Sequence, residues 1–282
     1  MPAPDLLSAI LRALSFIALA QAAGAALFLV CCGSALTAAR GAILTTVVVA
    51  AIAGMVRLPA QFLLEAGRMA GSMQGVFYAE LQRFARYTPY ADALLLRLVA
   101  LALLLLAALA HRTLRVAGPV GAILLAASFM LTGHAARQWV LGPLIVLHVL
   151  VVCFWFGSLL PLLRVTARES AGIAAAVVAR FSRIGGVVVP VILVAGVAAA
   201  VWLLPGLQSL GRPYGLGLIA KVVAFGILMA LAACNRWRLG PALASGDPQV
   251  QRRFRSVVLA EWILIAAVLA GTAALTLFLS PE

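Results

Sequence analysis

The chain has 282 residues, of which 65% are hydrophobic and only 10% are charged, and its formal net charge is +13. Soluble domains are about 45–50% apolar and about a quarter charged. The composition therefore excludes a soluble globular protein, a disordered chain and a disulfide scaffold. It also excludes an outer-membrane barrel, whose strands alternate apolar and polar positions. The basic residues suit the ends of membrane helices facing anionic lipid, rather than nucleic acid.

Eight apolar stretches are long enough to predict eight transmembrane helices in an all-α bundle. They run over residues 6–31, 41–64, 91–110, 116–133, 141–163, 183–204, 214–235 and 257–279. We expect two membrane halves of four spans each, residues 1–133 and residues 134–282. No nucleotide-binding loop, G-x-S-x-G or H-E-x-x-H motif occurs in the chain, so we expect no enzyme activity.

The longest connection between spans is residues 65–90. It contains aromatic and aliphatic side chains at helical spacing, namely Phe77, Tyr78, Leu81, Phe84 and Tyr87. This pattern predicts a short amphipathic helix that lies on the membrane surface.

The arginines predict the orientation of the spans, because basic residues concentrate in cytoplasmic loops. The connections after the first, third, fifth and seventh spans hold 12 arginines, and the opposite side holds 6. The protein is therefore predicted to lie in the bacterial inner membrane, with both termini and the connection 65–90 in the periplasm.

Several ionisable side chains fall within the spans, where a charge at mid-bilayer costs about 2.5–3.5 kcal/mol on insertion scales. Arg57, Arg97, His148 and Lys221 lie at a similar depth in the periplasmic leaflet, and His134 lies just above them. One interpretation is a polar cavity open to the periplasm and lined by the two histidines. The alternative is that the cations extend to the headgroups and that His148 bonds a neighbouring helix.

Glu261 lies near the cytoplasmic start of the last span. A buried carboxylate needs a partner, and Arg236 and Arg238 are at the same level. We therefore expect an ion pair with one of these arginines.

Four side chains are candidate metal ligands. Imidazoles suit copper, zinc, iron and nickel, and His134 and His148 flank a short connection between adjacent spans. Met69 and Met73 are four residues apart, so on a helix their thioethers would share one face and suit Cu(I). The alternative for the methionines is ordinary packing against lipid.

The segment from the fourth to the seventh span resembles the CopD family of bacterial copper-resistance membrane proteins. The resemblance rests on the order and spacing of short runs over about 110 residues. They are GlyHisAla at 133–135, LeuHisValLeu at 147–150, TrpPheGlySerLeuLeuProLeu at 155–162, ArgPheSerArgIleGly at 180–185, ValIleLeuValAlaGly at 191–196, ProTyrGlyLeuGlyLeuIleAlaLysVal at 213–222 and AsnArg at 235–236.

The resemblance implies passage of copper ions across the inner membrane, often with a periplasmic copper-binding partner of the CopC type. His134 and His148 would then be copper ligands at the periplasmic mouth, and the location of these ligands suits import. Trp155 lies two helical turns after His148 on the same face, where it could close the site or simply pack. Tyr214 and Lys221 also match the family pattern, without an assigned role.

Two other functions remain open from the sequence. Two histidines on neighbouring helices are also the axial ligands that a b-type haem needs, and Arg57, Arg97 and Lys221 could hold its propionates. Such a protein would transfer electrons. Alternatively, the protein could deliver copper to a partner without transporting it. Small residues in the sixth span, Gly185, Gly186 and Gly196, permit close packing within one chain or in a homo-oligomer.

Overall fold

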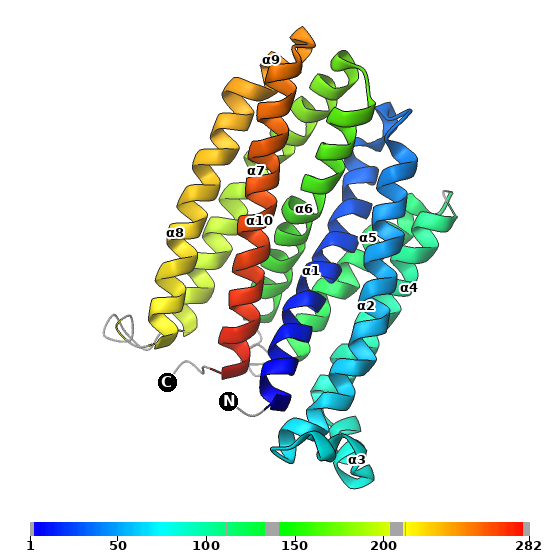
Figure 1. The fold of residues 1–282 in the computed structure, drawn as a ribbon, viewed down its shortest axis with the longest axis vertical. Helices are drawn as coiled ribbons and strands as arrows, with labels where there is room; N and C mark the ends of the chain where they lie inside the picture. The colour runs from blue at the N-terminus through cyan, green and yellow to red at the C-terminus, as the bar shows by residue number, and fades with distance from the viewer. Residues whose placement is uncertain (1–2, 111, 133–140, 204–210, 212, 279–282) are drawn as a thin grey trace.

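The structure, a computed structural model, describes residues 3–110, 112–132, 141–203, 211 and 213–278. These residues form a bundle of long helices, without strands in the described part of the chain (Figure 1). The helical elements in chain order are α1 (Ala3–Cys32), η1 (Gly33–Ala35), α2 (Arg40–Met69), η2 (Met73–Phe77), α3 (Ala79–Arg86), α4 (Pro89–Leu109), α5 (Leu114–Ala127), η3 (Ser128–Leu131), α6 (Leu141–Arg168), α7 (Ala171–Leu203), α8 (Pro213–Cys234), the π-helical turn η6 (Asn235–Leu239), α9 (Gly240–Ala242), η7 (Leu243–Ser245) and α10 (Pro248–Phe278).

Within the described residues, eight helices are long and apolar enough to cross a membrane. This confirms the predicted all-α polytopic architecture. The main difference lies at the helix ends, because α7 begins at Ala171 and α10 at Pro248, well before the apolar stretches begin. The added turns carry Arg180 in α7 and Arg252, Arg253 and Arg255 in α10, and arginine side chains can extend from such turns to the lipid headgroups.

The ends of the helices have local causes in the sequence. Asp247 precedes α10, and its Oδ1 accepts a hydrogen bond of 2.7 Å from the Gln249 N–H, which caps the helix. Gly71 and Gly246 adopt positive φ angles of 65° and 72°, which glycine tolerates best. Gly71 ends α2 before η2, and Gly246 ends the segment before α10.

Helix α1 is the centre of the bundle and packs against α2, α5, α6 and α10. Alanine is the commonest residue on its buried face, and Phe28 is fully enclosed. Helix α7 packs against α6, and α8 packs against α10. The two halves predicted from the sequence therefore meet along α1, while their division near residue 133 stays a prediction.

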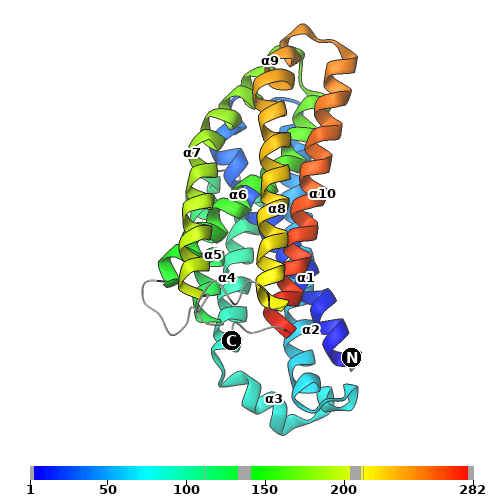
Figure 2. The ribbon, with the colours of Figure 1, turned by 90° about the vertical axis from the view of Figure 1, so that its left-hand side faces the viewer.

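The predicted short amphipathic helix in the connection 65–90 is α3, which projects from the end of the bundle where α1 begins and α10 ends (Figures 1 and 2). The surrounding aromatic side chains are exposed, and Tyr87 is the most exposed at 91%. Location at a membrane surface remains a prediction for this segment, and its exposed aromatic rings suit that environment.

Candidate functional site

His148 lies in the first half of α6, and its ring faces α7. A Cβ atom built on Gly196 would lie 3.7 Å from the His148 Cε1 atom, so the glycine leaves room for the ring. The His148 Nδ1 atom is buried and has no hydrogen-bond partner among the described residues. A buried nitrogen without a partner is costly, so this atom is a candidate to bind a ligand.

Two other predicted site residues lie near His148 in the fold. Lys221 of α8 is partly exposed and lies within electrostatic range of the imidazole. Trp155 lies further along α6, is only 7% exposed, and contacts Phe225 of α8 edge-on with 6.4 Å between ring centroids. Side chains of α6 thus reach α7 at Gly196 and α8 at Phe225.

Arg97 has a different environment, inside the first half of the chain. It is 4% exposed, its Nε donates a 3.0 Å hydrogen bond to Ser128 Oγ, and its guanidinium lies 4.6 Å from the centroid of Phe129. Ser128 in turn donates to the Leu125 carbonyl. These contacts hold Arg97 between α4 and η3, and they satisfy a buried cation by a hydrogen bond and a cation–π interaction.

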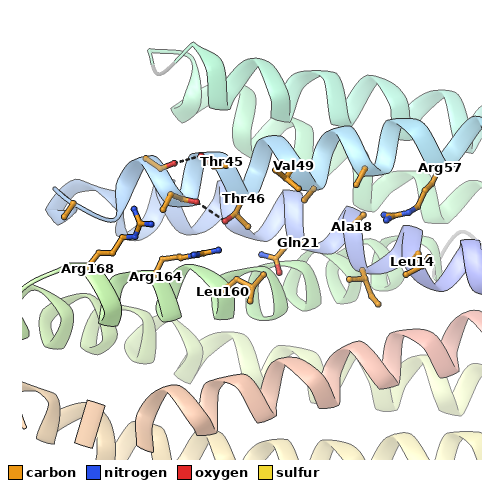
Figure 3. Close-up of a pocket in the computed structure, with 16 residues that line it drawn as sticks. Leu14, Ala18, Gln21, Thr45, Thr46, Val49, Arg57, Leu160, Arg164 and Arg168 are labelled. Atoms are coloured by element: carbon orange, nitrogen blue, oxygen red, sulfur yellow. Dashed lines mark hydrogen bonds between the residues drawn. The ribbon is translucent and has the colours of Figure 1, made fainter. Parts of the chain in front are cut away.

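Arg57 lies along a groove between α2 and α6, with α1 as its floor (Figure 3). The groove has a volume of about 720 Å³ and also contains Arg164 and Arg168. It does not contain His148, Lys221 or Arg97. Of the four polar groups predicted at one depth, Arg57 and Arg97 therefore have neighbours different from those of His148 and Lys221, because depth in the bilayer does not fix the direction in which a side chain points.

The two candidate methionine ligands do not share a helical face. Met69 is the last residue of α2, Gly71 turns the chain, and Met73 begins η2. Met69 is 41% exposed and Met73 is 42% exposed. They lie on the connection that projects from the bundle, and the predicted i, i+4 arrangement is broken by the turn at Gly71.

The predicted ion pair of Glu261 is wrong. Glu261 is 3% exposed, and its Oε1 accepts a 2.6 Å hydrogen bond from Asn235 Nδ2 in the π-helical turn η6. Arg236 instead donates to the carbonyl of Ser182 in α7. The π-helical turn brings Asn235, rather than the arginines that follow it, to face α10.

His134 lies outside the described residues, and so does the side chain of Tyr214 at the start of α8. Among the residues that are described, no three His, Cys, Asp or Glu side chains come together as a metal site. Arg57 and Arg97 do not surround His148 either, so the haem alternative gains no support from them.

Sequence reasoning missed a carboxylate that joins two connections at the other end of the bundle. The Glu169 carboxylate accepts hydrogen bonds from the N–H groups of Thr37 and Ala39 at 3.0 and 2.8 Å, and from the Thr37 hydroxyl at 2.8 Å. Burial raises the pKa of Glu169, but these hydrogen bonds from Ala39 and Thr37 outweigh it and lower the pKa overall. No local sequence signal identifies such a contact over 130 residues.

Sequence reasoning also missed Gln21, a neutral polar residue in the middle of α1. Gln21 Nε2 donates a 2.9 Å hydrogen bond to the Gly157 carbonyl, and its Oε1 accepts one of 3.1 Å from the Trp262 indole. The side chain therefore connects α1, α6 and α10. The signal that could have identified Gln21 is that it is the one amide side chain in the apolar stretch 6–31.

Two family models match this chain. The model described as Copper resistance protein D-like, N-terminal domain, matches residues 3–141, and the model described as Copper resistance protein D matches residues 175–275. The two matches together extend over most of the eight-helix bundle. No curated protein and no solved structure matches the chain.

Proposed function

Because the chain belongs to the CopD family of copper resistance proteins, we propose that it carries copper ions across the bacterial inner membrane, in the direction of import. Family membership makes it a copper-handling membrane protein. The observation that supports a site in this chain is the buried His148 Nδ1 atom, which lacks a hydrogen-bond partner among the described residues. Neutral imidazole is a suitable ligand for copper.

The proposed path begins at the end of the bundle where α3 projects. Exposed thioethers of Met69 and Met73 would capture copper there. The ion would pass to His134 and His148, with Trp155 as the apolar floor of the site. Lys221 would repel a bound copper ion, which favours release over tight retention, as conduction requires.

Orientation is part of the proposal. We infer that the end bearing α3 faces the periplasm, since the connections at the opposite end hold twice as many arginines. Helices α1 and α10 would then begin and end on the periplasmic side (Figure 1). A periplasmic copper-binding protein of the CopC type would donate the ion at this end. Membrane-impermeant labelling of a cysteine introduced at Thr88 in intact cells tests this orientation, and protection from label would contradict it.

The central experiment measures copper uptake into proteoliposomes that contain the purified protein. His148→Ala should reduce uptake at least tenfold, because the ion loses a ligand within the membrane. His111→Ala is the matched control, since it removes an imidazole from the connection between α4 and α5, and it should leave uptake unchanged. Equal uptake by wild type and His148→Ala would contradict the proposed site. Copper binding that depends on His148 without any uptake would favour delivery to a partner instead.

A further inference from the structure

The groove between α2 and α6 is lined by apolar side chains and by arginines, a combination that does not suit a metal ion. Its floor and walls are largely small or apolar, and include Ala18, Ala42, Ala50, Ala53 and Leu160. Its charged residues are all arginines: Arg57 at one end, and Arg164 and Arg168 at the other (Figure 3). No Asp, Glu, His, Cys or Met lines the groove, so it offers a copper ion repulsion and no soft ligand.

Arg164 and Arg168 form the charged end of this groove. They are four residues apart in the last turns of α6, so they share one helix face and repel each other. Both are exposed, and neither forms an ion pair with a carboxylate in the described part of the chain. Glu169 follows them directly, but its carboxylate is occupied by Thr37 and Ala39. The two guanidinium groups are therefore open to an external anion.

The length of the groove suits an acyl chain that lies within the bilayer. Along α2 it extends from Gly41 to Arg57, which is about 24 Å at 1.5 Å per residue. The hydrocarbon core of a bilayer is about 30 Å thick, so the groove runs through one leaflet and into the other. The hydroxyls of Thr45 and Thr46 already donate to the carbonyls of Gly41 and Ala42, which leaves the wall mainly apolar.

From this geometry we propose that the groove binds an anionic phospholipid from the leaflet at the Arg164 end. The phosphate lies between Arg164 and Arg168, which can each donate charge-assisted hydrogen bonds to it. One acyl chain lies on the floor formed by α1, between α2 and α6. The lipid thereby fills the space between a helix of the first half and a helix of the second half of the chain.

The test measures binding of phosphatidylglycerol and of phosphatidylcholine with identical acyl chains to the purified protein, by native mass spectrometry. Wild type should prefer phosphatidylglycerol. The double variant R164Q/R168Q should bind phosphatidylglycerol roughly 30-fold more weakly, since each arginine near a membrane surface contributes about 1 kcal/mol toward anionic lipid. The matched control R252Q/R253Q removes two exposed arginines from the start of α10, outside the groove, and should bind like wild type.

A third variant separates the acyl chain from the headgroup. Ala42→Phe fills the groove but keeps both arginines, so it should weaken binding of phosphatidylglycerol while leaving the thermal unfolding midpoint of the lipid-free protein near that of wild type. Three results would overturn the proposal: equal binding of the two lipids by wild type, equal losses in R164Q/R168Q and R252Q/R253Q, or displacement of the lipid by millimolar inorganic phosphate. The last result would indicate an anion site without a place for the chain.

Discussion

Gly24 of α1 and Gly157 of α6 bring the backbones of their helices into direct contact. A Cβ atom built on Gly157 would lie 2.5 Å from the Gly24 Cα and 2.6 Å from the Ala20 carbonyl oxygen. Side chains do not approach backbone atoms so closely, so both positions require glycine. This crossing joins two helices that the sequence predicts to belong to different halves of the bundle, α1 to the first and α6 to the second.

Replacing Gly157 by alanine should therefore separate α1 from α6. Extra atoms in a well-packed core typically lower the free energy of unfolding by about 1–3 kcal/mol. We expect the upper end of this range, because the obstructing atoms belong to the backbone. Thermal unfolding in detergent measures the loss. Gly226→Ala is the control, because Gly226 lies in α8 with nothing within 4 Å of a built Cβ. The stability of this variant should equal or slightly exceed that of wild type. Equal effects at both positions would contradict close packing at Gly157.

Gln21→Leu should destabilise the same crossing by loss of hydrogen bonds. The Trp262 indole N–H would lose its acceptor, Gln21 Oε1, at a cost of about 1–2 kcal/mol. Trp262→Phe removes the indole donor while keeping an aromatic ring to stack on Phe156, whose centroid lies 5.5 Å away. In a double-mutant cycle of unfolding free energies the two substitutions should be less than additive, and strict additivity would show that the two side chains do not interact.

The stability of the protein should depend on pH through Glu169. The pKa of Glu169 is lower in the folded protein than in the unfolded chain, where glutamate has a pKa of about 4.3. Its contribution is therefore fully present above the unfolded pKa and is lost as pH falls through the folded pKa. Glu169→Gln should lower the unfolding temperature at pH 7 and reduce its fall between pH 5 and pH 3. An unchanged pH profile in the variant would disprove this role.

Variants of Glu261 test whether its buried carboxylate is held by a hydrogen bond from Asn235 rather than by an ion pair with an arginine. Glu261→Gln retains an oxygen that can accept the hydrogen bond from Asn235 Nδ2, so the folded structure should be kept. Glu261→Leu leaves this buried amide without its partner, at a cost of about 1–3 kcal/mol. Limited proteolysis and thermal unfolding compare the two variants. Equal destabilisation by both would mean that the carboxylate makes a contact other than the one to Asn235.

The candidate site could be predicted only in part. The local sequence placed His148 in the membrane, and the structure leaves its Nδ1 without a partner among the described residues. The sequence also grouped Arg97 and Arg57 with His148, because all three lie at a similar depth. Arg97 instead turns to Ser128, and Arg57 lines the groove with Arg164 and Arg168. The direction of a side chain around its helix depends on which neighbour packs there, and a single sequence does not contain that information.

The sequence by itself determined the number of the membrane helices, the all-α class and the family. These properties follow from hydrophobicity summed over about 20 residues and from short runs in order, which need no knowledge of distant contacts. Only the tertiary structure decided that Gly24 meets Gly157, that Glu169 holds the connection before α2, and that Asn235 rather than Arg236 faces Glu261. Each of these contacts joins residues far apart in the chain, and each is set by the packing and rotation of whole helices rather than by any local pattern.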